Sequence, residues 1–367
     1  MNIAVNMTRF RAGKMGGIEP FVTNLIEEMA RTSDHHFYLF LPQHQKHLLR
    51  IEGRNVKKIG MAMDDSVDNL LRTWIGEWKM DYLFSPFFDS CPKGIDTPTF
   101  ILVPDLQHQY FPEFFHPTER MKRDQTIIDA KKSGARIITI SHFCKQTLIE
   151  KYGLHDSQVN VVYGDAPKEF HDQLRKQKLN RIRKKYNLPD VFGLYPANFW
   201  PHKNHPNLLK ALNLLKQTAG PKISLVFTGD EQANFSYVKT IKKMVQELDL
   251  EDQVSFLGYL PKKEMPFLYH DADFLVYPSL FEGFGIPLVE AMRTNTPIAA
   301  ANAGSIPEIV QSAALLFDPF DPNDIAEKMQ QMMKETIRKS LIAKGKERAA
   351  YFSWEKSAQT LLQLFNR

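Results

Sequence analysis

The sequence has little cysteine and no long apolar run. Its only cysteines are Cys91 and Cys144, and their spacing matches neither a disulfide framework nor a metal site. No stretch approaches the roughly 20 apolar residues that span a bilayer. The apolar start, Met1 to Met7, is followed by Arg9 and Arg11, whereas a signal peptide has its basic residues first. We therefore expect a first buried strand and a protein of the reducing cytoplasm.

A strong excess of one charge is also absent. The chain has 47 Lys and Arg against 42 Asp and Glu, a net charge of +5. This modest excess does not require a nucleic-acid partner, and we predict none. A hydrophobic content of 43% is that of a soluble globular protein. At 367 residues the chain is too long for one ordinary core and fits two domains.

Short β-branched runs alternate with helical patterns along the whole chain. This alternation predicts an α/β protein in which parallel sheets are covered by helices on both faces. Two such series flank a hydrophilic middle, so we expect two doubly wound domains. The predicted strands are Ile3–Met7, Phe37–Leu41, Tyr82–Ser85, Phe100–Val103, Arg136–Ile140, Phe192–Ala197, Ile223–Thr228, Val254–Leu257, Phe274–Tyr277 and Pro297–Ala301.

The domain boundary is expected within the hydrophilic middle. We assign residues 1–168 to an N-terminal domain and 169–352 to a C-terminal domain, with a final helix over 353–367 that Ser353 caps. A basic run from Arg175 to Lys185 follows the boundary. It is either a solvated helix face or a patch for a membrane or an acidic partner, and both readings stay open.

The segment Pro278–Met292 is the most informative for function. A strand ends at Tyr277, a loop with two glycines follows, and Pro287 suits the first turn of a helix. Free N–H groups at such a helix start attract phosphate. Glu282 and Glu290 flank the loop, and their carboxylates would accept hydrogen bonds from sugar hydroxyls. Spacing alone also allows a tight turn with two exposed acids.

The paired glutamates resemble the motif of retaining glycosyltransferases of family 4, which have the two-domain GT-B fold. The resemblance covers nearly the whole chain. It implies two Rossmann-like domains facing across a cleft, with the final helix crossing back to the N-terminal domain. Its other segments are Met15–Glu19, Ile140–Lys145, Phe199–His205, Phe227–Gly229, Asp271–Phe274 and Phe352–Trp354.

The resemblance implies a donor site in the C-terminal domain. It gives Glu282 a contact with the donor sugar and Glu290 the ribose hydroxyls. Lys203 is the expected cation beside the leaving diphosphate, where a fixed charge favours the transition state. The backbone N–H groups expected to hold the diphosphate are those of Phe284, Gly285 and Ile286.

Two further donor contacts are expected less directly. Asn198 stands where relatives commonly have an arginine, five residues before Lys203, so more of the charge neutralisation falls on Lys203. Gly16 and Gly17 precede a helix that Pro20 is expected to begin, and they suit a contact with the donor diphosphate. Gly-Gly alone is also common in turns.

The segment Asp105–His108 is expected at a strand end of the N-terminal domain. It resembles a segment of a mannosyltransferase-like subset, in which a histidine commonly precedes the aspartate. Here that position is Pro104. Either Asp105 or His108 contributes to catalysis in its place, or the cluster only shapes the acceptor pocket.

The function implied is retaining, metal-independent hexosyl transfer. No resident cofactor or metal is expected, since the nucleoside-diphosphate sugar is a co-substrate. GDP-mannose is the first choice of donor and a UDP-hexose the second, with a glycan or lipid-linked glycan as acceptor. Basic residues suggest peripheral contact with the inner membrane face. The alternatives are a sugar-nucleotide epimerase of the same fold and a non-catalytic glycosyltransferase-like subunit.

Overall fold

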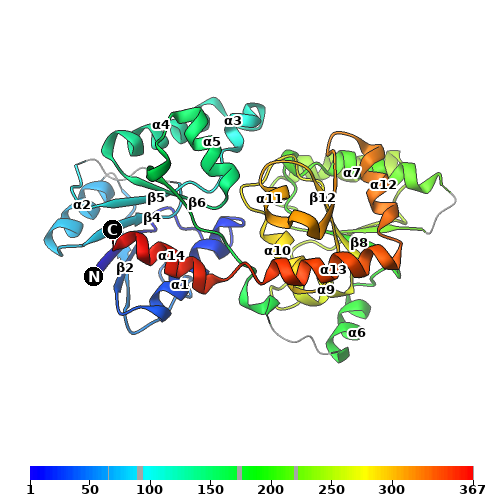
Figure 1. Ribbon diagram of the computed structural model, residues 1–367, viewed down its shortest axis with the longest axis horizontal. Helices are drawn as coiled ribbons and strands as arrows, with labels where there is room; N and C mark the ends of the chain where they lie inside the picture. The colour runs from blue at the N-terminus through cyan, green and yellow to red at the C-terminus, as the bar shows by residue number, and fades with distance from the viewer. Residues whose placement is uncertain (65, 89–93, 172–175, 219–221, 367) are drawn as a thin grey trace. The chain divides into compact units, whose positions relative to one another are not determined.

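The computed structural model describes residues 1–64, 66–88, 94–171, 176–218 and 222–366. The chain divides into two compact units, Met1–Asp165 with Ser353–Arg367, and Ala166–Phe352 (Figure 1). The boundary predicted after residue 168 falls in the short helical turn Lys168–Phe170, just past this division. Each unit is a doubly wound α/β layer structure of its own.

The N-terminal unit is built on a seven-stranded parallel sheet in the order β3-β2-β1-β4-β5-β6-β7. The central β1 has Ile3, Ala4 and Val5 almost fully buried, because helices cover both faces of the sheet. The strands are β1 (Asn2–Asn6), β2 (His36–Pro42), β3 (Val56–Met61), β4 (Tyr82–Ser85), β5 (Thr99–Leu102), β6 (Arg136–Thr139) and β7 (Val159–Val161).

The helices of this unit include the last helix of the chain, which packs on the first. The rings of Phe21 and Trp354 meet edge to face at 5.6 Å, and Ser357 Oγ donates to the Tyr163 carbonyl at 2.6 Å. Ser353 caps this helix by accepting from the Lys356 N–H. The helices are α1 (Ile18–Thr32), α2 (Val67–Glu77), α3 (Gln107–Tyr110), α4 (Pro117–Ser133), α5 (His142–Tyr152) and α14 (Trp354–Phe365).

The C-terminal unit has a six-stranded parallel sheet in the order β10-β9-β8-β11-β12-β13. Every residue of the central β11 is buried. The strands are β8 (Phe192–Pro196), β9 (Ser224–Thr228), β10 (Val254–Phe256), β11 (Phe274–Tyr277), β12 (Ile298–Ala301) and β13 (Ala314–Phe317).

The helices of the C-terminal unit lie on both sides of its sheet (Figure 1). They are α6 (Lys176–Lys185), α7 (His205–Lys216), α8 (Phe235–Glu247), α9 (Met265–Asp271), α10 (Ile286–Arg293), α11 (Ile306–Val310), α12 (Pro322–Gln331) and α13 (Glu335–Ala349). Among the described residues, no helix is both long enough and apolar enough to cross a membrane.

Candidate active site

Three loops meet at the carboxyl edge of the C-terminal sheet. They follow the neighbouring strands β8, β11 and β12, which carry Lys203, Glu282 and Gly304 into one place. The Lys203 Nζ lies 2.6 Å from Glu282 Oε1, and the Glu282 carbonyl accepts from Ser305 Oγ at 2.9 Å. This edge of a doubly wound sheet is the usual place for a ligand.

Two glycines stand at close approaches, one in the loop between β11 and α10 and one in the loop after β12. Gly285 has φ +89°, and a Cβ there would lie 2.8 Å from Leu288 Cδ1. Gly304, from the next loop, has φ +57°, and its Cβ would lie 3.0 Å from the Glu282 carbonyl oxygen. Gly304 therefore permits the close backbone approach to Glu282, and Gly285 permits the left-handed turn before α10.

The start of α10 offers hydrogen-bond donors. Within the described part of the chain, the N–H groups of Gly285 and Ile286 donate to no acceptor, and Pro287 has no N–H. Two open donors with the helix dipole behind them can bind an anion. Phe284 instead has a buried ring, packed edge to face against Phe352 at 5.6 Å, so its side chain anchors the loop.

Lys203 and Glu282 form a largely buried ion pair. Their side chains are 15% and 13% exposed. Burial is the largest single influence and would raise the pKa of Glu282, but the charge of Lys203 and the hydrogen bonds from Lys203 and Ser279 together lower that pKa below its usual value. The pair thus presents a charged ammonium and a charged carboxylate side by side, suited to a ligand with both anionic and hydroxyl groups.

A tight turn holds Lys203 in this position. The 3-10 segment Pro201–Lys203 is followed by Asn204 in the left-handed region, φ +60°. Asn204 Nδ2 donates to the carbonyls of Pro278 and Pro319, and Tyr195 OH donates to the Lys203 carbonyl at 2.6 Å. The backbone at Lys203 is therefore tied to two other loops of the same unit.

Glu290 lies on α10 and bonds to Tyr269 on α9. The Tyr269 hydroxyl donates to Glu290 Oε2, whereas Oε1 has no partner among the described residues. Burial raises the pKa of Glu290 to about 7, although the bond from Tyr269 opposes the shift. Glu290 is therefore a carboxyl that changes charge near neutral pH.

His202 and His205 flank the lysine as neutral rings. His205 is fully buried, stacked on Phe199 at 4.7 Å, and neither of its nitrogens has a partner among the described residues. Burial lowers the pKa of both histidines to about 3. His205 begins α7 and packs as an aromatic ring.

The burial of His205 predicts acid sensitivity. In the unfolded chain His205 takes up a proton below its ordinary pKa of 6.5, whereas in the fold it stays neutral to about pH 3. Its contribution to the free energy of unfolding is therefore present above pH 6.5 and falls by up to about 1.4 kcal/mol per pH unit below it. Chemical denaturation from pH 7.5 to 4.5 should show a shallower loss in His205→Phe than in wild type. Identical slopes would contradict this description of the ring.

Asn198 is occupied in shaping a neighbouring turn. Its Oδ1 accepts from the Asp230 N–H at 2.9 Å. The same turn contains Gly229, where a Cβ would lie 2.4 Å from the Ala197 carbonyl oxygen. The structure thus gives Asn198 a role in joining the loops after β8 and β9, and its donor contact stays a prediction.

Gly16 and Gly17 lie on the N-terminal unit, at the start of α1. Both are exposed, Gly16 has φ +61°, and a Cβ at either would meet nothing within 4 Å. The helix begins at Ile18, two residues before Pro20, so the prediction that Pro20 begins it was wrong by that margin. Two exposed residues at a helix start are accessible to a phosphate, and their contact with the donor diphosphate stays a prediction.

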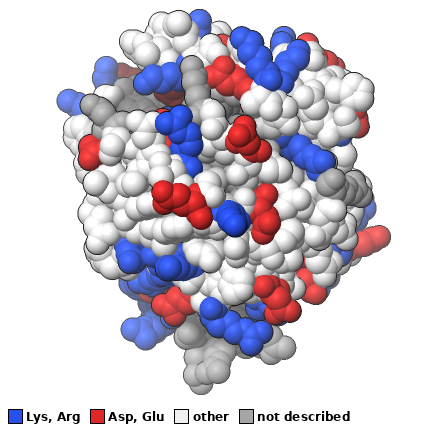
Figure 2. Space-filling model, turned by 90° about the vertical axis from the view of Figure 1, so that its left-hand side faces the viewer, with Lys and Arg blue, Asp and Glu red and all other residues white. Residues whose placement is uncertain are grey.

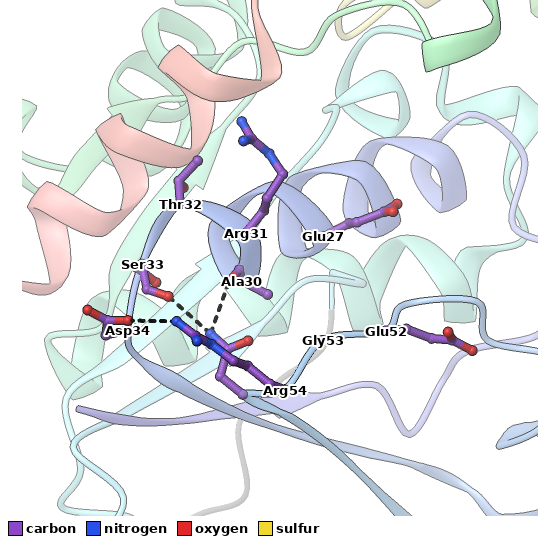
Figure 3. Close-up of a pocket in the computed structure, with 10 residues that line it drawn as sticks. Glu27, Ala30, Arg31, Thr32, Ser33, Asp34, Glu52, Gly53 and Arg54 are labelled. Carbon is purple, nitrogen blue, oxygen red and sulfur yellow. Dashed lines mark hydrogen bonds and ion pairs between the residues drawn. The ribbon is translucent and has the colours of Figure 1, made fainter.

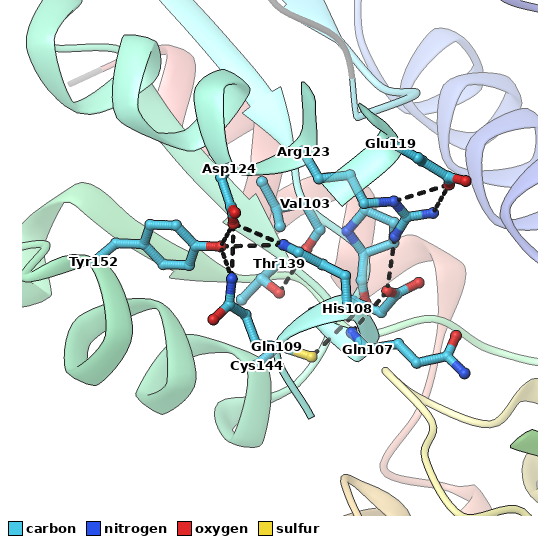
Figure 4. A network of polar contacts seen from close by, with 12 residues as sticks. Val103, Gln107, His108, Gln109, Glu119, Arg123, Asp124, Thr139, Cys144 and Tyr152 are labelled. Carbon is cyan, nitrogen blue, oxygen red and sulfur yellow. Dashed lines mark hydrogen bonds and ion pairs between the residues drawn. The ribbon is translucent and has the colours of Figure 1, made fainter. Parts of the chain in front are cut away.

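Asp105 and His108 have different surroundings, and Figure 4 shows those of His108. Asp105 accepts from the Gln107 N–H at 3.1 Å and pairs with Arg123 at 3.2 Å. His108 has no exposed side-chain surface, and its Nε2 lies 3.1 Å from both Asp124 Oδ1 and Tyr152 OH. Since a buried ring cannot touch an acceptor in this conformation, His108 fits the pocket-shaping alternative better than the catalytic one.

Three residues that were not predicted from the sequence complete these clusters. Tyr269, Ser305 and Arg123 each bond to a predicted site residue. None of them lies in a segment that resembles the family. The fold brings each of them next to its partner. Tyr269 had one available signal, since it lies two residues before the Asp271–Phe274 segment.

A cavity of about 540 Å³ lies in the N-terminal unit, at the edge of the sheet where strands β2 and β3 begin. It is lined by the end of α1 and the segment before β3, including Glu27, Arg31, Glu52 and Arg54 (Figure 3). Arg54 pairs with Asp34 at 3.6 Å. The cavity is thus remote from the carboxyl edge of its sheet, and its charges are mixed.

Part of the predicted basic run is paired within the C-terminal unit. Arg183 bonds to Asp271 at 2.9 Å, and Lys185 bonds to Glu264 at 2.7 Å. Arg175, where the run begins, lies outside the described residues. These two ion pairs favour the solvated-face reading of the run. On the face that Figure 2 draws, which is not the side of α6 in Figure 1, Lys and Arg are interspersed with Asp and Glu.

Residues 176–348, nearly all of the C-terminal unit, match the family described as glycosyl transferases group 1. The C-terminal unit is a group 1 glycosyl transferase domain. The family predicted from the paired glutamates is thereby confirmed, and Lys203, Glu282 and Glu290 all lie in the matched range.

Curated relatives of this chain include enzymes named for O-antigen synthesis. The O-antigen chain mannosyltransferase B of Escherichia coli is 28% identical over 243 residues, 66% of this chain and 63% of the relative. The O-antigen chain mannosyltransferase RfbU of Salmonella typhimurium is 28% identical over 60% of this chain and 57% of its own length. The chain therefore spans less than two thirds of these relatives.

Solved structures confirm the predicted GT-B fold of the chain. Anabaena Alr3699/HepE, in complex with UDP and glucose, aligns with a TM-score of 0.78 over 100% of this chain and 99% of its own, at 20% identity. Sucrose-phosphate synthase from Thermosynechococcus elongatus aligns with a TM-score of 0.80 over 100% and 98%, at 18% identity.

Proposed function

We propose that the protein is a retaining glycosyltransferase that moves a hexose from a nucleoside-diphosphate sugar to a glycan. One observation carries the proposal: Lys203, from the loop after β8, lies 2.6 Å from Glu282 in the loop that leads into the open N–H groups of α10. Diphosphate would bind to these N–H groups and to Lys203. The names of the mannosyltransferase relatives and of the UDP-bound structural relative support a nucleotide-sugar donor.

In the proposed mechanism the protein supplies orientation and charge. Lys203 neutralises the negative charge that develops on the leaving diphosphate, and it does so more strongly in the transition state. Glu282 orients the donor sugar, and Glu290 accepts from the ribose hydroxyls. The acceptor attacks on the face from which the diphosphate leaves, and a donor phosphate oxygen takes its proton, so the reaction needs no protein nucleophile.

We propose GDP-mannose as the first donor and a UDP-hexose as the second. The first choice rests on the Asp105–His108 segment and on the names of the O-antigen mannosyltransferases. The acceptor is a glycan or a lipid-linked glycan, and the lipid-linked form would bring the cytoplasmic enzyme to the inner membrane face. Transfer is proposed to be metal-independent, so EDTA should leave the rate unchanged.

A thermal-shift series with nucleoside-diphosphate sugars tests this function. A ligand that binds only the folded state stabilises it by about 2.7 kcal/mol at 100 times its Kd. GDP-mannose should raise the Tm most, UDP-glucose less, and mannose 1-phosphate hardly at all. If no nucleotide sugar raises the Tm at millimolar concentration, the proposed donor site is wrong.

A further inference from the structure

A second constellation lies on the N-terminal unit, around Arg123 of α4. The guanidinium carbon is 4.7 Å from the ring centre of Phe115 and 5.4 Å from that of Phe88. Arg123 also pairs with Asp105 Oδ1 at 3.2 Å and with Glu119 Oε1 at 3.2 Å (Figure 4). Aromatic contacts and two carboxylates thus fix one guanidinium in place.

Each carboxylate uses only one oxygen for Arg123. Asp105 Oδ2 and Glu119 Oε2 contact no hydrogen-bond donor among the described residues. The side chains of Arg123, Asp105 and Glu119 are 25%, 31% and 52% exposed. Two oriented acceptor oxygens therefore remain available to a ligand from solvent.

The segment that follows Asp105 is held by hydrogen bonds. Gln107, whose backbone N–H bonds to Asp105, has a buried side chain. The next residue, His108, lies within hydrogen-bond distance of Asp124 and Tyr152 in the partly buried network already described. These bonds restrain the segment that carries Asp105, so its carboxylate is preorganised for binding.

The position and chemistry of the constellation suit a sugar. Asp105 follows β5, so the group lies at the carboxyl edge of its sheet, where ligands bind in doubly wound domains. Carboxylate oxygens accept from sugar hydroxyls, and aromatic rings such as the partly exposed Phe115 offer an apolar surface to the ring C–H groups.

The charge of the constellation selects against an anionic ligand. Two carboxylates, those of Asp105 and Glu119, pair with the one guanidinium of Arg123, so the three groups together carry a net negative charge. Burial, together with the charge of Arg123, lowers the pKa of His108, so that ring adds no positive charge at neutral pH. A phosphorylated sugar would meet net negative charge, which disfavours its binding.

We propose that Asp105, Glu119 and Arg123 form the subsite for a neutral hexopyranose at the end of the acceptor glycan. The proposal rests on the proposed function, because it names the class of acceptor that the transferase uses. In it, Asp105 and Glu119 bind hydroxyl groups directly. Arg123 is a positioning residue that orients both carboxylates.

Saturation-transfer NMR on the full-length protein tests the subsite without catalysis. The probes are methyl α-D-mannopyranoside, as a neutral hexopyranoside, and mannose 6-phosphate, as its anionic counterpart. We expect the neutral probe to bind, with a Kd raised about tenfold in both Glu119→Gln and Asp105→Asn, since each loses a charge-assisted hydrogen bond. The control Glu113→Gln, at an exposed carboxyl of the same segment, should bind like wild type.

Several outcomes would overturn the subsite. They are tighter binding of mannose 6-phosphate, wild-type binding by Glu119→Gln, and no binding of the neutral probe at millimolar concentration. The donor-induced Tm shift, measured on the same samples, separates the two proposals. A donor shift without probe binding contradicts the subsite alone, whereas probe binding without any donor shift contradicts the proposed transferase function.

Discussion

Lys203→Ala is expected to lower kcat/KM for hexosyl transfer by about 10² to 10³-fold, the cost of removing one fixed charge or donor at a developing anion. The lysine is held in place by the Pro201–Asn204 turn and by Tyr195. The neighbouring His202 cannot replace its charge, because burial lowers the pKa of that histidine to about 3. Steady-state kinetics with varied donor measures the effect.

The Lys203 variant needs a stability control, because Glu282 loses its partner. An unpaired, largely buried carboxylate destabilises a fold by about 3–5 kcal/mol in the extreme case. The double variant Lys203→Met with Glu282→Gln removes both charges and should recover part of the lost Tm without recovering activity. Lys210→Ala, an exposed lysine on α7, serves as the matched surface control. Wild-type kcat/KM in Lys203→Ala would remove the lysine from the mechanism.

Glu290→Gln is expected to raise the donor Kd by about 10 to 100-fold, because two charge-assisted bonds to ribose hydroxyls are weakened. Glutamine can still accept from Tyr269, so the packing of α10 on α9 should survive. Isothermal titration with GDP-mannose measures the Kd. Glu251→Gln, at an exposed carboxyl away from the site, is the control and should match wild type.

The same glutamate makes donor binding pH-dependent. With a pKa of about 7 in the free protein, Glu290 is increasingly protonated below neutral pH. The ribose hydroxyls favour the ionised form, so donor affinity should fall by up to about tenfold per pH unit below 7 and level off above it. Glu290→Gln should lose this slope. An equal slope in both proteins would show that another group is responsible.

The sequence predicted the central strands well and the edge strands poorly. All ten predicted strands are present, to within about one residue at each end. The three that were missed, β3, β7 and β13, are all at sheet edges. An edge strand has a neighbour on one side only and tolerates polar residues, as Lys57 and Lys58 in β3 show, so its apolar signal is weak.

The candidate site was predictable where one segment carries it. Glu282, the glycine loop and Glu290 lie within nine consecutive residues, and Lys203 lies in a second recognisable segment. The partners that set their charge come from elsewhere. Tyr269 on α9 meets Glu290, and Arg123 on α4 meets Asp105, only because the fold brings separate helices together. Burial, which holds His108 and His205 neutral, likewise has no local sequence signal.

The most direct test of the proposed function is an NMR-monitored reaction of the purified chain with GDP-mannose and a neutral α-mannoside. The account predicts that GDP is released only when the acceptor is present. It also predicts a new anomeric proton signal with the α configuration of the donor. A β-linked product would contradict retention, and conversion of the donor to an epimer without acceptor would contradict transfer. No turnover of GDP-mannose or of any UDP-hexose would contradict the proposed activity itself.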